Sequence, residues 1–252
     1  MVMANDKIQI CKKENIEQFE ELSKLTGQLA HEIKNPLSTI KINLKLINEE
    51  LAELLSAGSN ERASEKGERS LGRALRKISV IEKETDRLEQ ILDGFLRYLD
   101  RTELQLGNID LNELISDMID FYSPQASSHG ITMREALSKE PLVCRIDPDM
   151  IKQVILNLFI NSQQAMPGGG ELIVRTFQEG EEAVVQVFDT GCGITVDNLP
   201  HIFEAYYSSR PQGSGLGLPT AKKIIQQHKG TIKVESEPTK GTVFTIRLPI
   251  LK

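Results

Sequence analysis

A histidine inside a strongly periodic segment is the first residue whose type and position could support chemistry. His31 lies two residues from both Leu29 and Ile33, which belong to an apolar repeat. At about 100° per residue, its side chain lies roughly opposite the apolar stripe of a helix. Glu32 could accept the imidazole Nδ1 proton and make Nε2 the better nucleophile. Asn35, four residues on and so on the same helical face, could hold a water near a phosphoryl group.

A proline one turn later strengthens this interpretation, because most exposed helical histidines have no chemical role. Pro36 removes the amide that would bond to the Glu32 carbonyl, at a cost of about 3 kcal/mol inside a helix. The apolar repeat continues past Pro36, so we expect the helix to bend rather than to end. An unfavourable feature next to His31 favours a functional reason for both.

A second group of polar residues lies on another predicted helix. Asn157 and Asn161 are spaced i, i+4, so both carboxamides project from one helix face. Neutral oxygen ligands suit contacts with phosphate and with Mg²⁺, which keeps several waters of its own. The apolar residues that would bury the opposite face are Val154, Ile155, Leu158 and Phe159.

An aspartate followed by glycines comes directly after a predicted strand. The Asp189 carboxylate could accept a hydrogen bond from an adenine amino group, and Gly191 and Gly193 would let the backbone approach the base. Thr242, on a late predicted strand, could contact the base from another side. Each motif alone is a weak signal, since glycine-rich segments usually only form turns.

A second glycine cluster precedes a predicted helix. Gly213, Gly215 and Gly217 would place backbone amides and the helix N-terminus around an anion, and Pro219 suits the first turn of that helix. The segment does not match the dinucleotide fingerprint, because the required preceding strand and βαβ unit are missing. The roughly 20 residues between the Asp189 motif and Gly213 predict a lid that orders around bound nucleotide.

The elements that must position these residues differ along the chain. Two apolar stripes at helical spacing, over residues 22–55 and 71–99, predict long helices joined as a hairpin by a polar connection at 57–70. The first stripe comprises Leu22, Leu25, Leu29, Ile33, Leu37, Ile40, Leu44, Ile47, Leu51 and Leu54. One hairpin buries such stripes poorly, whereas two copies forming a four-helix bundle would bury them. The charged residues 1–21 continue the first helix or lead into it.

The remainder predicts an α+β sandwich with helices on one face of a mixed sheet. Asp147 and Pro148 indicate the start of a helix, as an N-cap residue followed by proline in the first turn. Further helices are expected at 110–126 and 218–228. Strands are expected at 131–136, 142–146, 172–177, 183–188, 231–236 and 243–248.

Bulk properties exclude several classes of protein. The 252 residues favour two domains, and the net charge of −6 argues against nucleic-acid binding, which needs a basic surface. Three scattered cysteines fit neither a disulfide framework nor a Cys-x-x-Cys metal site. No apolar run approaches about 18 residues, and the N-terminus has no signal-peptide pattern. We expect a cytoplasmic protein, either by itself or as the soluble part of a membrane-anchored sensor.

Together, these motifs resemble those of sensor histidine kinases in their family order. LAHEIKNPLSTI resembles the H-box, DPDMIKQVILNLFINSQQAM the N-box, DTGCGI the G1 box, HIFEAYYSSR the F-box and GSGLGLPTAKKII the G2 box. The end of the N-box looks like that of the nitrogen-regulator subgroup. The resemblance implies a lead-in at 1–21, a dimerising phosphotransfer hairpin at 22–104 and a catalytic ATP-binding domain of the Bergerat (GHKL) type at 105–252.

The resemblance also implies a role for each matching residue. His31 would accept the phosphoryl group, Glu32 would be its acid/base partner, and Asn35 would orient the water that hydrolyses a phosphoaspartate. Asn161 would bind Mg²⁺ and Asn157 would help at the phosphates of ATP. Asp189 would recognise adenine. The glycines that would shape the pocket and its lid are Gly191, Gly193, Gly213, Gly215 and Gly217. The implied partners are a second copy of the chain and a response-regulator receiver domain.

The chain departs from the family pattern at a few positions. One is Ser162, directly after Asn161, where alanine is commoner in the family. None removes a catalytic group. Two other interpretations remain open at this point. One is a GHKL ATPase that performs mechanical work, which leaves HEIKNP without a purpose, and the other is a dimeric scaffold that binds nucleotide without turnover.

Overall fold

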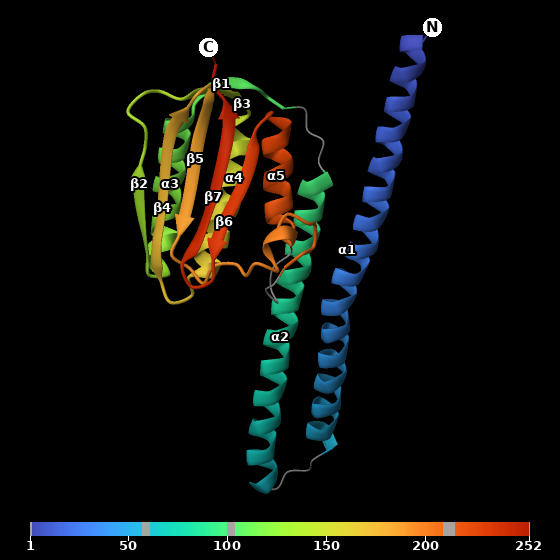
Figure 1. Cartoon of the computed structure of the whole chain (residues 1–252). Helices are drawn as coiled ribbons and strands as arrows, with labels where there is room; N and C mark the ends of the chain where they lie inside the picture. The colour runs from blue at the N-terminus through green and yellow to red at the C-terminus, as the bar shows by residue number, and fades with distance from the viewer. Residues whose placement is uncertain (1, 57–60, 100–103, 209–214, 252) are drawn as a thin grey trace. The chain divides into compact units, whose positions relative to one another are not determined.

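The computed structural model describes residues 2–56, 61–99, 104–208 and 215–251. The chain forms two compact units, Met1–Leu96 and Arg97–Lys252, and each is described by itself. The first unit is helical, and the second combines helices with strands (Figure 1).

Two long helices form the first unit. Helix α1 spans Val2–Ser56, so the charged residues before position 22 continue the helix. Helix α2 spans Glu61–Leu99. The expected connection at 57–70 was therefore wrong for residues 61–70, which belong to α2. The reason is composition: apart from Gly67, the sequence ERASEKGERS contains residues that are compatible with a helix. Residues 57–60 lie outside the described part of the chain.

Helix α1 continues through its internal proline. Pro36 is buried, and the helix is unbroken on both sides of it. After the proline, the Ser38 hydroxyl donates to the Lys34 carbonyl over 2.8 Å, and the Thr39 hydroxyl donates to the Asn35 carbonyl over 3.3 Å. The expectation that the helix does not end at Pro36 is confirmed.

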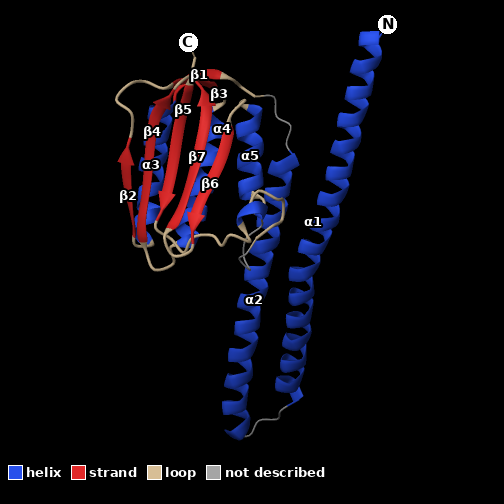
Figure 2. Cartoon of the chain, in the orientation of Figure 1, coloured by secondary structure: helices blue, strands red, loops and turns tan. Residues whose placement is uncertain are grey.

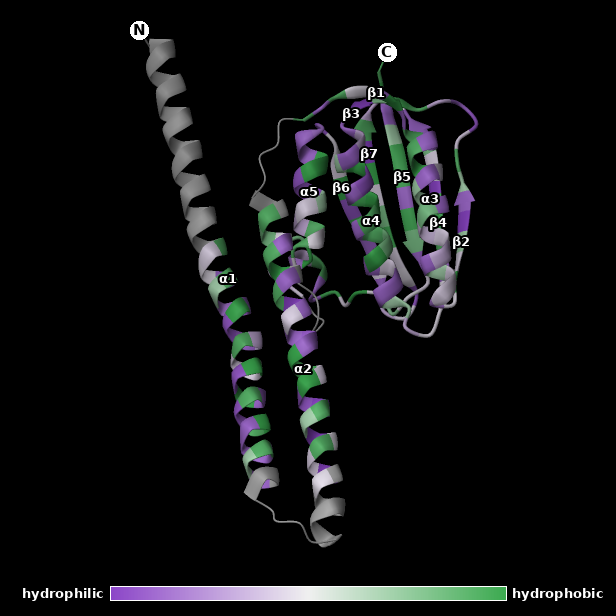
Figure 3. Ribbon diagram, turned by 180° about the vertical axis from the view of Figure 1, so that it is seen from behind, coloured by the Kyte–Doolittle hydropathy of each residue, from purple (hydrophilic) through white to green (hydrophobic). Residues whose placement is uncertain are grey.

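The hairpin buries few of its own apolar residues. Charged side chains link the two helices, with Glu50 of α1 paired to Arg73 at 3.6 Å and also to Lys77 of α2. Figure 3 shows apolar residues along both helices. The large apolar side chains that stay exposed on the hairpin are Leu37, Ile42, Leu44, Leu46, Leu51, Leu71, Leu75, Ile78, Val80, Leu92 and Leu96. A single hairpin therefore leaves much of both stripes uncovered.

A mixed five-stranded sheet forms one layer of the second unit (Figure 2). Its strand order is β2-β4-β5-β7-β6, with β2 parallel to β4 and the other neighbours antiparallel. The strands span Ile131–Ala136 (β2), Gly170–Glu179 (β4), Glu182–Asp189 (β5), Thr231–Glu237 (β6) and Gly241–Pro249 (β7). All five were expected from the sequence, although β4, β5, β6 and β7 extend beyond their predicted ranges, β4 by two residues at each end.

A separate two-stranded sheet joins β1 (Gly107–Asp110) to β3 (Val143–Ile146) in antiparallel fashion. Strand β3 was expected and β1 was not. The four residues GNID contain one apolar side chain, too few to show an alternating pattern. The partner strand therefore becomes visible only in the fold.

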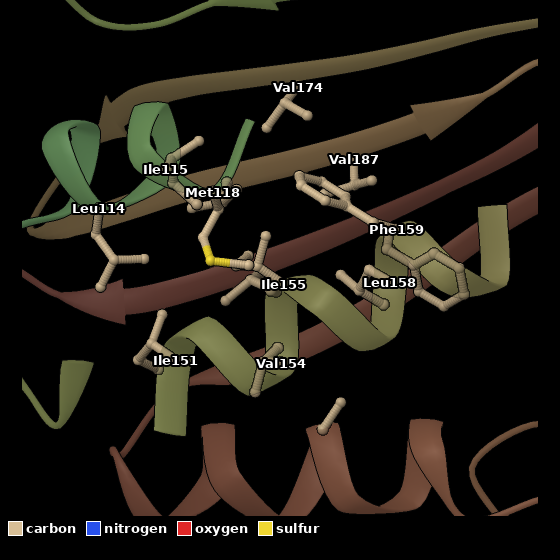
Figure 4. Close-up of a cluster of buried hydrophobic side chains, with 14 of the residues drawn as sticks. Leu114, Ile115, Met118, Ile151, Val154, Ile155, Leu158, Phe159, Val174 and Val187 are labelled. Carbon is tan, nitrogen blue, oxygen red and sulfur yellow. The ribbon is translucent and has the colours of Figure 1, made fainter. Parts of the chain in front are cut away.

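Three helices cover one face of the five-stranded sheet, as predicted (Figures 1 and 3). They are α3 (Leu111–Ser128), α4 (Pro148–Ala165) and α5 (Gly217–Gln227). Asp147 caps α4 by accepting from the amides of Asp149 and Met150, which confirms the predicted helix start. Figure 4 shows the core, where side chains of α3 and α4 pack against β4 and β5.

A buried histidine joins the start of α4 to the end of α5. His228 is 5% exposed, and its Nδ1 lies 2.8 Å from the Ile224 carbonyl. Its Nε2 accepts the Asp147 amide over 2.9 Å. The Asp147 carboxylate also accepts from the Gln105 amide, 2.9 Å away. These bonds fix the spacing of the two helices that carry the predicted phosphate-binding residues.

The two described cysteine side chains are free, and they differ in environment. Burial, and then the nearby Asp110 carboxylate, raises the pKa of the Cys144 thiol to about 11, so this thiol stays protonated at neutral pH. Cys192 is exposed. No helix in the described ranges is long and apolar enough to span a membrane.

Candidate active site

The predicted nucleophile lies on the surface of the hairpin. His31 and Asn35 are both exposed, as their position opposite the apolar stripe predicted. Glu32 is half-buried, and its Oε2 lies 3.7 Å from Nη2 of Arg87 on α2. Sequence reasoning did not find this pairing, because the two residues belong to different helices. The ion pair holds the Glu32 carboxylate in place directly after the exposed imidazole in the sequence.

The second unit brings a buried carboxylate to the end of β5. Asp189 is 2% exposed. Its Oδ1 accepts from the Gly191 amide at 2.9 Å, and its Oδ2 accepts from the Ser162 hydroxyl of α4 at 3.2 Å. Thr242 of β7 lies directly across from Asp189 in the sheet register and is also buried. The two residues predicted to contact adenine are therefore neighbours in the fold.

At the glycines after Asp189 the backbone lies so close to neighbouring residues that a side chain has no room. A Cβ on Gly191 would lie 2.7 Å from the Ala165 Cβ and 2.8 Å from the Asp189 carboxylate. Gly193 has φ +70°, and a Cβ there would overlap the Glu237 carbonyl. The Cys192 amide donates to the Ala165 carbonyl over 3.0 Å, which ties this turn to the end of α4. The glycines thus let the backbone pass close to Ala165, Asp189 and Glu237, and the predicted approach to an adenine base stays a prediction.

The two asparagines of α4 differ in what they contact. Asn157 Nδ2 donates to the Gly217 carbonyl over 3.2 Å and so links α4 to the first residue of α5. Asn161 lies one turn later and is half-buried. Sequence reasoning expected Asn157 to act at phosphates, whereas its amide here holds the first turn of α5.

The start of α5 lies beside a tight backbone crossing. Gly215 has φ +65°, and a Cβ there would lie 2.5 Å from the Tyr206 carbonyl carbon. The Tyr206 amide donates to the Gly215 carbonyl over 3.0 Å. Among the described residues no side chain caps α5, so its first amides are suited to bind an anion. Gly213 lies outside the described residues.

Most of the predicted lid already packs on the domain. We expected the whole segment after Gly193 to order around nucleotide, but residues 194–208 have a defined path in the structure. Ile202 is buried in the core, Tyr207 Oη donates to Asn198 over 2.8 Å, and Lys222 of α5 lies 5.4 Å from the Phe203 ring centre. The apolar residues Ile202 and Phe203 were the available sequence signal for this anchoring.

The described side chains include no group of three or more His, Cys, Asp or Glu that could hold a metal ion. The Asp189 carboxylate already binds Gly191 and Ser162. Mg²⁺ commonly keeps its waters and takes one or two protein ligands besides substrate phosphates. A single amide oxygen such as that of Asn161 fits a Mg²⁺ that arrives with a nucleotide.

Two domain families match the chain. The His Kinase A (phospho-acceptor) domain matches residues 21–104, and the histidine kinase-, DNA gyrase B- and HSP90-like ATPase family matches residues 146–252. The sensor histidine kinase ZraS of Klebsiella oxytoca is 36% identical over 237 residues, covering 93% of this chain and 47% of that protein. Sporulation kinase E of Bacillus subtilis is 31% identical, covering 91% of this chain and 29% of that protein. The chain thus spans about half the length or less of these relatives.

Solved structures share the fold. The histidine kinase ThkA, in complex with the response regulator TrrA, aligns with a TM-score of 0.73 and 25% identity, covering 95% of this chain and 65% of that one. The separate catalytic domain of ThkA aligns with a TM-score of 0.54 and 28% identity, covering 58% of this chain and 96% of that one.

Replacing Gly191 by alanine is expected to weaken binding of an adenine nucleotide by about tenfold or more, because overpacking at such a site costs about 1–3 kcal/mol. The new Cβ would displace Ala165 or the Asp189 carboxylate. Calorimetric titration of the chain with ADP measures the change. Gly168→Ala is the matched control, since a Cβ there meets nothing within 4 Å. Equal affinity in Gly191→Ala and the wild type would contradict the prediction.

Proposed function

This chain belongs to the sensor histidine kinase family, and we propose that it transfers the γ-phosphoryl group of ATP to its own His31. From there the group passes to an aspartate of a response-regulator receiver domain. The observation that carries the proposal is an exposed histidine with an adjacent fixed carboxylate, in the same chain as a buried aspartate and a glycine-lined turn suited to adenine. Neither an ATPase that does mechanical work nor a nucleotide-binding scaffold needs both features.

In the proposed transfer, the lone pair of His31 Nε2 attacks the γ-phosphorus in line. The bond from phosphorus to the β–γ bridging oxygen breaks, and ADP leaves with that electron pair. Glu32 accepts the Nδ1 proton, which removes the positive charge from the phosphorylated ring. Arg87, whose Nη2 lies 3.7 Å from Glu32 Oε2, supports this role because the ion pair orients the acceptor.

The catalytic unit contributes mainly by positioning the substrate, as in other phosphoryl transfers. Asp189 accepts from the adenine amino group, with Thr242 beside it, and the first amides of α5 bind phosphate oxygens. Asn161 would hold Mg²⁺, which neutralises charge on the phosphates when bound. Asn157 keeps the first turn of α5 in place through Gly217.

We also propose which part of the chain performs which function. Residues 1–21 lead into the hairpin, residues 22–104 form the dimerising phosphotransfer hairpin, and residues 105–252 form the catalytic ATP-binding domain. A receiver domain docks on the exposed surface around His31. Solvent exposure of His31 and Asn35 supports this site, because both the catalytic domain and the receiver must reach the same imidazole.

Labelling with γ-³²P-ATP and Mg²⁺ tests the transfer. We expect acid-labile label on the wild type, none on His31→Ala, and at least about a hundredfold less on Asn161→Ala, since a metal ligand at a phosphoryl site is worth several kcal/mol. His129→Ala is the control, because His129 is an exposed histidine of the catalytic unit. Persistent label on His31→Ala would remove His31 as the acceptor, whereas ATP hydrolysis without label would favour the mechanical ATPase.

The position of Asn35 supports a second activity, hydrolysis of the receiver's phosphoaspartate. Asn35 is exposed one turn after His31, where its amide can orient a water. Asn35→Ala is expected to slow dephosphorylation of a phosphorylated receiver by at least about tenfold while His31 labelling persists. Asn48→Ala, an exposed asparagine of the same helix, serves as the control. Equal dephosphorylation rates in Asn35→Ala and the wild type would remove Asn35 from this role.

The uncovered apolar stripes support a homodimer in which two hairpins form a four-helix bundle. Leu75 is 58% exposed on α2, and burying a leucine contributes about 1.5–3 kcal/mol. Light scattering should give twice the 28.2 kDa chain mass for the wild type, and Leu75→Asp should lower it towards the monomer. Phe121→Asp, which changes an exposed apolar residue of α3, should leave the mass unchanged. A monomeric wild type would contradict the dimer.

A further inference from the structure

Arg87 of α2 has one charged partner among the described residues, the Glu32 carboxylate of α1. Its Nη2 lies 3.7 Å from Glu32 Oε2, which is longer than a hydrogen bond, and the two side chains are 29% and 30% exposed. Arginine carries five N–H donors in a planar fork. Within the described part of the chain, the guanidinium of Arg87 donates no hydrogen bond. Its donors are therefore available to a further acceptor.

The contact between Glu32 and Arg87 lies on the flank of the hairpin that carries His31. At about 100° per residue, His31 and Asn35 lie to one side of Glu32 around α1, and the buried Pro36 lies to the other side. Because Glu32 and Arg87 are both partly exposed, they meet at the edge of the packing between the helices, and that edge is the one next to His31. The guanidinium can therefore turn from Glu32 towards His31 without crossing the packed interface.

The proposed transfer changes the charges around Arg87. Before the transfer the attacking imidazole is neutral, and Glu32 is the anion that Arg87 contacts. Afterwards Glu32 has accepted the Nδ1 proton and is neutral, whereas a phosphoryl group at neutral pH carries about −1.5 to −2 charge and three acceptor oxygens. A guanidinium binds such a group through two parallel hydrogen bonds. The stronger acceptor for Arg87 is then on His31.

We propose that Arg87 exchanges Glu32 for the phosphoryl group of phosphorylated His31, and so stabilises the phosphohistidine. This inference rests on the proposed function, in which His31 accepts the γ-phosphoryl group and Glu32 accepts the Nδ1 proton. It deepens that function by giving Arg87 a contact that exists only after the transfer. Such a contact shifts the equilibrium of the reaction, because it favours one of the two states of the protein. Orienting Glu32 before the transfer would change only the rate.

The test measures the equilibrium between ATP and the phosphohistidine. The full chain is incubated with γ-³²P-ATP, Mg²⁺ and a fixed ratio of ATP to ADP, and the acid-labile label is followed until it is constant. A second sample is labelled first, freed of nucleotide and given the same mixture. Agreement of the two end points shows that equilibrium has been reached.

In Arg87→Ala we expect the ratio of phosphorylated to unphosphorylated chain to fall about tenfold, the effect of one lost hydrogen bond to a charged group. Arg87→Lys keeps the charge without the planar fork, so its ratio should lie between those of Arg87→Ala and the wild type. Arg76→Ala is the matched control and should keep the wild-type ratio, because Arg76 is an exposed arginine about three turns away on α2. Thermal melting shows whether each variant is folded, and Arg87→Gln replaces Arg87→Ala with the same expected fall if Arg87→Ala is not.

An Arg87→Ala chain that is labelled more slowly but reaches the wild-type ratio would overturn the inference, because Arg87 would then only orient Glu32. The wild-type ratio reached at an unchanged rate would overturn it as well. In both cases label on His31 of the wild type keeps the proposed function intact. A wild type without acid-labile label would overturn the proposed function and this inference together.

Discussion

A carboxylate buried at the end of a central strand constrains how the second unit packs. An ionised group out of water is costly unless donors surround it, and Asp189 is almost fully buried. Its donors include the Gly191 amide and the Ser162 hydroxyl. This arrangement requires the end of α4 to lie against the end of β5, and it requires a residue without a Cβ at position 191. The same constraint leaves lone pairs in a fixed orientation, as recognition of an amino group requires.

Helix α4 meets this constraint because its contacts hold it along its whole length. Its first turn is capped by Asp147, whose amide donates to His228 at the end of α5. Its middle holds the first residue of α5 through Asn157. Its last turns bind the strand end and the following turn through Ser162 and Ala165. The first turn of α5 and the end of β5 are thus both placed by contacts with α4.

The hairpin differs from the second unit, because its proposed chemistry requires an exposed histidine rather than a buried carboxylate. His31 lies opposite the apolar stripe and is exposed, as the proposed transfer to and from this imidazole requires. The stripe itself remains largely uncovered within one chain, which leaves apolar area available for a second copy. Glu32, next to His31 in the sequence, pairs with Arg87 on the neighbouring helix.

Local patterns in the sequence determined the helices, the main sheet strands, the Asp147 cap and the exposure of His31, because each depends on residues a few positions apart. The order of the motifs determined the family. Tertiary structure alone decided the β1–β3 pair, the Glu32–Arg87 pair and the Ser162 contact with Asp189. The partners in that last contact are 27 residues apart, and no periodicity links them. Such contacts depend on how helices and strands pack, a spatial relation that residue spacing along the chain does not contain.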